Sequence, residues 1–150
     1  DIFTLVHLTK LYARDMVARK SGHILQVASI GAYQPCPTYA TYGAAKSFVL
    51  QFSDAIGYEL RKTGVKICTL SPGPTATEFF QVSGQKMTAY QRRTMMDSKT
   101  VVRMGLDAML SGKPRKVPGF MNALGAWLVR FIPRHLATAI ANATMQPPPS

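Results

Sequence analysis

The sequence predicts an α/β fold with a parallel sheet, and three observations carry that prediction. Apolar residues recur at helical spacing over 2–20 and again over 39–62. A short, predominantly apolar run follows each of these segments, at 23–28 and at 65–70, as is typical of buried strands. The resulting order of helix, strand, helix, strand implies parallel strands that are joined by right-handed crossovers.

The first helix and the first strand have clear boundaries. Arg19 and Lys20 stand at the end of the first helical segment, where a helix dipole favours cations, and Gly22 ends the helical pattern. The apolar run 23–28 then lies between that glycine and Ser29. We therefore expect a buried strand that ends directly before Ser29.

The second helix and strand are bounded in the same way. The segment 31–38 contains a glycine and two prolines without a regular period, so we expect a loop. The helical pattern over 39–62 contains no proline, and Gly64 follows it in the place of a C-terminal cap. The strand predicted at 65–70 must end at the turn 71–74, which contains two prolines.

These boundaries indicate where a ligand would bind. In parallel α/β sheets, ligands bind beyond the carboxyl ends of the strands. Ser29 and Pro72-Gly73 each follow a predicted strand directly, and the helix that begins near Tyr39 lies between them in the chain. We expect the functional site at this edge of the sheet.

The second half of the chain is less regular, and we treat 1–146 as one domain with a disordered proline-rich tail at 147–150. A break at Pro133 divides the last helical region into a pair of helices. The predicted elements are short helices at 88–96 and 99–110, a strand or loop at 113–118, and helices at 119–132 and 134–145.

The chain is strongly basic, and its charge is uneven. The formal net charge is +11, with eight Lys and Arg against five Asp and Glu through Gln85, and ten against two from Lys86 onward. A basic face can attract nucleic acid, anionic lipid or a phosphorylated cofactor, and it can also be a solvated surface. No basic cluster interleaved with aromatic residues supports a nucleic-acid module.

Metal sites and membrane spans find no support in the sequence. The three histidines are scattered, and Cys36 and Cys68 form neither a disulfide framework nor a metal-ligand pattern, which fits a reducing cytoplasm. The longest apolar stretches are interrupted by Arg, His or Pro, so we expect no spanning helix of about 20 residues.

Tyr42 and Lys46 carry the chemistry that the pattern predicts. Residues four apart lie on one face of a helix, so the Lys46 ammonium is expected near the Tyr42 hydroxyl. A free tyrosine has a pKa of about 10, and a nearby cation favours the phenolate, which makes a tyrosine usable for proton transfer. The alternative for an isolated pair is a solvated helix face.

Ser29 adds a hydroxyl at a strand end, thirteen residues before Tyr42. A hydroxyl there can donate a hydrogen bond to a carbonyl oxygen and stabilise developing negative charge. The alternative is a serine that caps a turn.

Together these features resemble the short-chain dehydrogenases/reductases. The stretch GHILQVASIGAYQPCPTYATYGAAKSFVLQFSDAIGYELRKTGVKICTLSPGPTATEFF has the serine, the thirteen-residue gap, the YxxxK helix and the PG-x-x-x-T turn in the family's order. The resemblance runs from Asp1 to about Phe80. It continues more loosely through VPGFMNALGAWLVRFIPRHL, which is similar to the tail of bacterial enzymes related to long-chain oxoacyl and hydroxysteroid reductases.

The resemblance implies a fold and a reaction. The fold would be a Rossmann-like doubly wound parallel sheet with a helical carboxyl-terminal region. The reaction would be hydride transfer between a nicotinamide cofactor, NADP or NAD with NADP slightly favoured, and a hydrophobic ketone or alcohol. In reduction Tyr42 would give a proton to the carbonyl oxygen, Lys46 would hold the nicotinamide ribose and favour the phenolate, and Ser29 would polarise the carbonyl. The implied cofactor-binding residues are Tyr42, Lys46, Pro72, Gly73, Pro74, Thr75 and Thr77.

Two departures from the family pattern stand out. Asp1 falls where the family has an asparagine that supports a water relay, and a carboxylate cannot donate as an amide does. The family's glycine-rich turn, which cradles the pyrophosphate, does not occur in these 150 residues. We therefore expect a chain that begins within a longer protein, lacks the amino-terminal βαβ units and binds the cofactor poorly by itself. The rival hypothesis is a non-catalytic remnant that acts by association.

Two further surfaces suggest partners. The helices 1–20 and 39–62 form a dimer interface in many family members, so we expect a homo-oligomer. The apolar positions of 119–135 fit the core, a dimer contact or a peripheral membrane contact. They are Phe120, Leu124, Trp127, Leu128 and Phe131, with Arg130 and Arg134 beside them.

Overall fold

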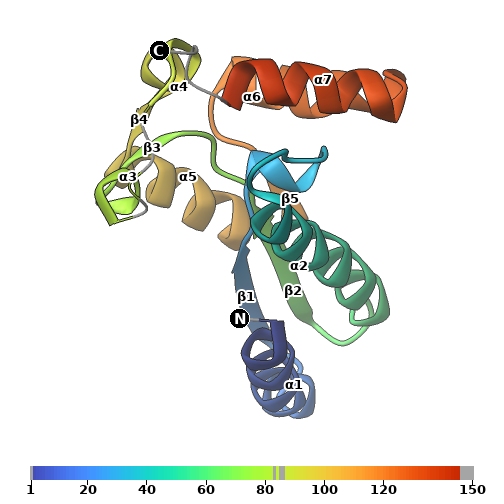
Figure 1. Ribbon diagram of the computed structural model, residues 1–150. Helices are drawn as coiled ribbons and strands as arrows, with labels where there is room; N and C mark the ends of the chain where they lie inside the picture. The colour runs from blue at the N-terminus through green and yellow to red at the C-terminus, as the bar shows by residue number, and fades with distance from the viewer. Residues whose placement is uncertain (1, 83, 85–86, 146–150) are drawn as a thin grey trace.

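The computed structural model describes residues 2–82, 84 and 87–145 and has the expected alternation of helices and strands (Figure 1). Asp1 and the predicted tail 147–150 lie outside the described residues. The elements are α1 (Ile2–Ala18), β1 (Gly22–Val27), η1 (Ile30–Ala32), α2 (Ala40–Glu59), β2 (Val65–Leu70), β3 (Thr75–Ala76), α3 (Phe79–Val82), α4 (Ala89–Thr94), β4 (Met96–Asp97), α5 (Ser98–Leu110), β5 (Arg115–Lys116), α6 (Phe120–Leu128), η2 (Val129–Phe131) and α7 (Arg134–Met145).

The main sheet is parallel and has the strand order β1-β2-β5. β1 and β2 pair along their whole length, from Gly22 opposite Val65 to Val27 opposite Leu70. The central strand β2 is buried at every position except Lys66, which explains its predominantly apolar sequence. The α/β class predicted from the sequence is therefore confirmed.

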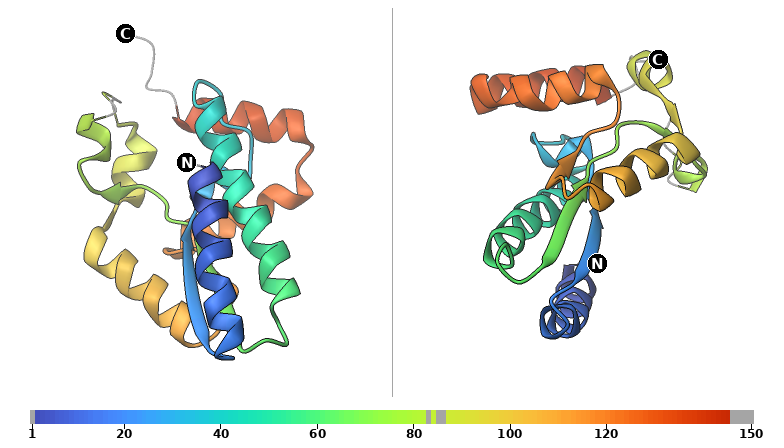
Figure 2. Two further views of the ribbon diagram at one scale, coloured as in Figure 1. Left: turned by 90° about the horizontal axis from the view of Figure 1, so that it is seen from below. Right: turned by 180° about the vertical axis from the view of Figure 1, so that it is seen from behind.

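Helices cover both faces of this sheet (Figure 2). α2 and α5 lie on opposite faces, α1 packs against β1 beside α2, and α6 and α7 lie beyond the carboxyl ends of the strands (Figure 1). The buried residues Ala28, Ala32, Val49 and Leu50 form a core cluster where the end of β1 and η1 meet α2. The site expected after β1 thus lies next to this buried cluster.

The loops that follow β1 and β2 continue side by side. The Ala28 amide donates to the Leu70 carbonyl at 2.8 Å, and the Ile30 amide donates to the Pro72 carbonyl at 2.9 Å. These bonds extend the parallel ladder past the last strand residues. They bring the segment after Ser29 against the turn at Pro72, as the sequence predicts for a ligand-binding edge.

The prediction that Gly64 caps α2 is wrong. The helix ends at Glu59 with Leu60 as its C-cap, and tight turns follow. Gly64 has a φ of 85°, and a Cβ there would lie 2.1 Å from the Lys20 carbonyl oxygen. The glycine is required where the turns that lead into β1 and β2 approach each other.

Short elements in the second half were not predicted. β3 and β4 form a separate two-stranded parallel pair of two residues each, and α3 has four residues. Segments this short carry no measurable period, so the sequence could not indicate them. Within the described part of the chain, no helix has the length and apolar character needed to cross a membrane.

Candidate active site

Ser29 follows β1 with one residue, Ala28, between them, and it caps the short helix η1. Its backbone is extended, and its side-chain oxygen accepts a hydrogen bond from the Gly31 amide at 3.1 Å. The prediction that Ser29 caps a turn is therefore correct, because its hydroxyl oxygen accepts the capping hydrogen bond. Among the described residues the Ser29 hydroxyl proton has no acceptor, so this largely buried group can still donate to a ligand.

Lys46 reaches from α2 to the end of β1. Its Nζ donates to the Val27 carbonyl at 3.1 Å and lies 5.9 Å from the centre of the Tyr42 ring. The two side chains share one helix face, as their spacing predicts. Burial lowers the pKa of the Lys46 ammonium below its ordinary value. The bond to Val27 fixes the cation beside the aromatic ring while leaving further N–H donors.

Gly31 brings Ser29 and Tyr42 together. A Cβ built on Gly31 would lie 3.6 Å from the Ser29 Oγ and 3.7 Å from the Tyr42 Cε1. A third neighbour, the Cys36 Sγ, would lie 3.2 Å away, and the Cys36 thiol donates to the Gly31 carbonyl at 3.3 Å. The distances to Ser29 and Tyr42 are ordinary van der Waals separations, so Gly31 lies between the two side chains, and only the Cys36 Sγ would be tight against an added Cβ. Burial raises the pKa of the Cys36 thiol, which favours its neutral, structural form.

The turn after β2, which is the predicted cofactor-binding wall, lies against the segment that follows Ser29. The Thr75 hydroxyl donates to the Gly73 carbonyl at 3.0 Å, and the Thr77 hydroxyl donates to the Thr75 carbonyl at 3.5 Å. Pro72, Gly73, Pro74 and Thr75 are half-buried, whereas Thr77 is exposed. Of the residues predicted for this wall, Thr77 is therefore the most accessible.

Asn122 is a residue of this region that sequence reasoning missed. It is buried on α6 and lies against Gly73, where a Cβ would be 2.4 Å from the Asn122 Nδ2. The Nδ2 donates to the Pro118 carbonyl at 3.0 Å, and the Oδ1 has no partner among the described residues. The available signal was an uncharged polar residue inside the largely apolar segment 119–132, but nothing in the sequence indicated that it would meet Gly73.

Other predicted features stay apart from this site. In the described ranges, no group of three or more His, Cys, Asp or Glu side chains is arranged to hold a metal ion. Phe120, Trp127 and Phe131 are exposed by 79, 53 and 69%, so their assignment to the core is wrong. The dimer and membrane interpretations of that segment stay predictions.

Comparisons with known proteins agree with this arrangement. Residues 1–88 match the model of a family described as short chain dehydrogenase. The 17-beta-hydroxysteroid dehydrogenase type 3 of Mus musculus is 32% identical over 108 residues, which make up 72% of this chain and 35% of that protein. A very-long-chain 3-oxoacyl-CoA reductase of Phaeosphaeria nodorum is 42% identical over 62 residues, or 41% of this chain and 18% of that protein. The chain thus spans about a third or less of these relatives.

Solved structures have the same fold. A 7beta-hydroxysteroid dehydrogenase matches with a TM-score of 0.77 at 18% identity, over 93% of this chain and 55% of that one. A short chain dehydrogenase from Burkholderia cenocepacia J2315, solved in complex with NADP, matches with a TM-score of 0.73 at 21% identity, over 97% and 56%. The Rossmann-like fold is therefore confirmed, with this chain corresponding to about half of each solved protein.

Proposed function

This chain belongs to the short-chain dehydrogenase family, and on that premise we propose that the protein containing it transfers hydride between a nicotinamide cofactor and a carbonyl or alcohol substrate. One observation carries the proposal. Ser29, Tyr42 and Lys46 converge at the carboxyl end of β1, with Ser29 and Tyr42 both against Gly31 and Lys46 bound to Val27. Two hydroxyls and one cation in this arrangement suit proton transfer at a carbonyl oxygen.

Ser29 orients the substrate in this proposal. Because the Gly31 amide already occupies the acceptor side of its hydroxyl, the Ser29 proton is directed to the carbonyl oxygen. Negative charge grows on that oxygen during reduction, and a fixed donor stabilises it more in the transition state than in the ground state.

Tyr42 gives the proton to the carbonyl oxygen, and Lys46 supports it. A cation 5.9 Å from the ring centre favours the phenolate that proton donation leaves behind. In the oxidative direction the same phenolate accepts the proton from the alcohol. The bond from Lys46 to the Val27 carbonyl holds the cation in place throughout.

The chemistry of the donors and acceptors here fits a nicotinamide. A carboxamide needs acceptors for its NH₂ group, and the Thr75 oxygen keeps lone pairs because its hydroxyl donates its proton to the Gly73 carbonyl, with Thr77 exposed two residues further along the same turn. Lys46 keeps N–H donors for the ribose hydroxyls, and Tyr42, Pro72, Gly73 and Pro74 complete the proposed cofactor wall. A bound nicotinamide supplies or accepts the hydride. NADP is the slightly favoured form, because two solved relatives are complexes with NADP or NADPH.

The substrate class that we propose is hydrophobic. The names of the relatives indicate a steroid dehydrogenase and a very-long-chain oxoacyl-CoA reductase, which are proteins with large apolar substrates. A steroid-like ketone or a long-chain oxoacyl compound is therefore the first choice for assay.

Substitution of Tyr42 tests the reaction in the full-length protein. We expect Tyr42→Phe to lower kcat/KM for ketone reduction by about 100-fold or more, since general acid catalysis contributes that much. Tyr58→Phe is the matched control, because it removes the same hydroxyl from an exposed position of α2. NADPH oxidation followed at 340 nm gives both rates. Full activity of the Tyr42→Phe protein would contradict the mechanism.

A second proposal concerns association, and the exposed apolar side chains favour it. Phe3, Leu11 and Tyr12 are exposed on α1, beside a hollow of about 410 Å³ between α1 and α2, which suits a homo-oligomer contact.

Phe120 and Phe131 are exposed near Arg130, which suits a peripheral contact with an anionic membrane. Vesicle sedimentation of a Phe120→Ser/Phe131→Ser variant tests the membrane contact, and unchanged sedimentation would contradict it.

The compartment is a further proposal. Cys36 and Cys68 are free and buried, which fits a reducing compartment such as the cytoplasm. Thiol labelling of the protein purified from cells without reductant would test it, and labelling of both Cys36 and Cys68 in the unfolded protein is the expected result.

A further inference from the structure

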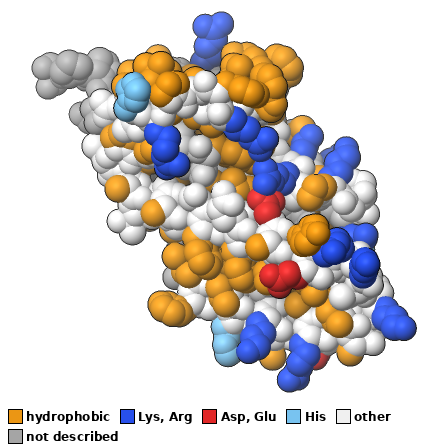
Figure 3. Space-filling model, turned by 90° about the vertical axis from the view of Figure 1, so that its right-hand side faces the viewer, with side chains coloured by type: hydrophobic (Ala, Val, Ile, Leu, Met, Phe, Trp, Pro, Cys, Tyr) orange, Lys and Arg blue, Asp and Glu red, His pale blue; other side chains and the backbone are white. Residues whose placement is uncertain are grey.

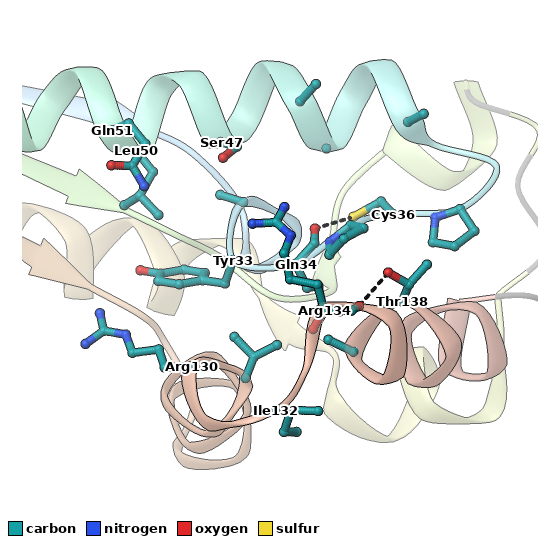
Figure 4. Close-up of a pocket in the computed structure, with 18 of the residues that line it drawn as sticks. Tyr33, Gln34, Cys36, Ser47, Leu50, Gln51, Arg130, Ile132, Arg134 and Thr138 are labelled. Carbon is teal, nitrogen blue, oxygen red and sulfur yellow. Dashed lines mark hydrogen bonds between the residues drawn. The ribbon is translucent and has the colours of Figure 1, made fainter.

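A cavity of about 750 Å³ lies behind the candidate active site. Its walls are the loop 31–38, one face of α2, and the segment that joins η2 to α7 (Figure 4). Ser29, Tyr42 and Lys46 do not line it, so the cavity is a second recess, separate from the catalytic trio. Its volume falls within the range of small-molecule sites.

Arginines from three parts of the sequence line this cavity. They are Arg115 at β5, Arg130 in η2 and Arg134 at the start of α7. Arg115 is neutralised, because its Nε donates to the Asp54 Oδ1 at 2.8 Å and its second nitrogen also contacts that carboxylate. Arg130 and Arg134 form no ion pair within the part of the chain that the structure describes. Both arginines line the recess without an ion-pair partner among the described residues, and in Figure 4 the Arg130 side chain points away from Arg134.

The rest of the lining complements an anion with an organic body. No described lining residue is Asp or Glu, and Gln34, Ser47 and Thr138 add hydrogen-bonding side chains. In Figure 4 the Arg134 side chain extends from α7 towards Gln34 and α2. Ile132 and Val129 supply apolar surface. The surrounding face is basic as well, with Lys and Arg side chains spread over it and few acidic ones (Figure 3).

We propose that this cavity binds a phosphate-bearing organic anion at a site separate from the catalytic trio. Guanidinium groups bind phosphate through paired hydrogen bonds, and their planar fork suits this better than an ammonium group. Arg134 would hold the phosphate, Arg130 would add positive charge to the same recess, and Gln34 and Ser47 would add neutral hydrogen bonds. This site does not depend on the proposed oxidoreductase function.

Calorimetric titration with inorganic pyrophosphate tests the proposal in the intact protein. We expect saturable binding that weakens at least tenfold in an Arg130→Gln/Arg134→Gln variant. An Arg92→Gln/Arg93→Gln variant is the matched control, because it removes the same charge from exposed positions of α4 that do not line the cavity. Its affinity should stay within about twofold. Circular dichroism melts of both variants check that each is folded.

Three outcomes would overturn the site. One is no saturable binding of pyrophosphate to the unmodified protein. A second is an equal loss in both double variants, which would assign the effect to diffuse positive charge. The third comes from sedimentation with phosphatidylserine vesicles: vesicle binding that needs Arg130 and Arg134, without pyrophosphate binding, would assign the arginines to a lipid surface.

Discussion

The two sides of α2 differ in what surrounds them. On one side, Tyr42 and Lys46 face Gly31 and Val27, which are close to them in the sequence and belong to the same βα unit. On the other side, Gly43 and Ser47 line the basic cavity, whose arginines come from the last 40 residues of the chain. One helix thus serves a locally encoded site and a recess assembled from distant segments.

This difference shows which kind of site a sequence reveals. The Tyr42 side is encoded by spacing within one helix and one strand end, and helical geometry converts that spacing directly into proximity. The cavity side depends on where α6, η2 and α7 lie against α2, which is set by tertiary packing. No period or motif within 119–145 indicates that Arg134 would meet α2.

Loss of the Lys46 ammonium gives the largest effect that we expect. In the full-length protein, Lys46→Met should lower kcat/KM by about 100-fold or more, because proton transfer at Tyr42 loses its supporting cation. Lys62→Met is the matched control: it makes the same change at an exposed lysine beyond the end of α2. Steady-state reduction of a ketone measures both. Similar rates for the two variants would remove Lys46 from the site.

The first half of the fold was predictable because its signals are local. The strand 65–70 was predicted with the bounds of β2, and 23–28 differs from β1 by one residue at each end. α2 was predicted three residues too long at its carboxyl end, since apolar periodicity cannot tell a last helical turn from the tight turns at 60–63. Proximity of Ser29 and Tyr42 followed from the family spacing, whereas their roles stay predictions.

The rest could not be read from the sequence, for physical reasons. β3 and β4 owe their pairing to the placement of the Pro72–Thr77 segment beside α5. The Gly73–Asn122 contact joins residues 49 positions apart without a motif at either end. Such contacts are fixed only when the sheet and the carboxyl-terminal helices have assembled.

A substitution at Gly73 tests the contact between the turn after β2 and Asn122 on α6. We expect it to have an intermediate effect, on stability. A Cβ at position 73 would lie 2.4 Å from the Nδ2 and 2.7 Å from the Cγ of buried Asn122. Gly73→Ala should therefore lower the free energy of unfolding by about 1–3 kcal/mol through overpacking. Urea denaturation measures it.

Two variants give this stability test its controls. Gly125→Ala lies on the same helix as Asn122 and has no atom within 4 Å of its added Cβ, so it should be neutral or slightly stabilising. In a Gly73→Ala/Asn122→Ala variant, the loss should be smaller than the sum of the single losses, since the clash is removed. Strict additivity would show that the contact with Asn122 is not the cause.

The smallest expected effect is a pH dependence of stability from Lys46. Burial lowers the pKa of its ammonium, so the charged form is less favourable in the folded chain than in the unfolded chain. At neutral pH both states are protonated and the folded protein bears this cost in full. As the pH rises through the folded pKa towards the unfolded value of about 10.4, the folded state loses its proton first and the cost declines.

The unfolding free energy of the unmodified protein should therefore rise relative to that of Lys46→Met over this alkaline interval. Urea denaturation at a series of pH values measures the difference, with Lys62→Met as the control for general loss of charge. A difference that falls with pH would mean that the Lys46 ammonium is stabilised by its contacts with Val27 and Tyr42 more than it is disfavoured by burial.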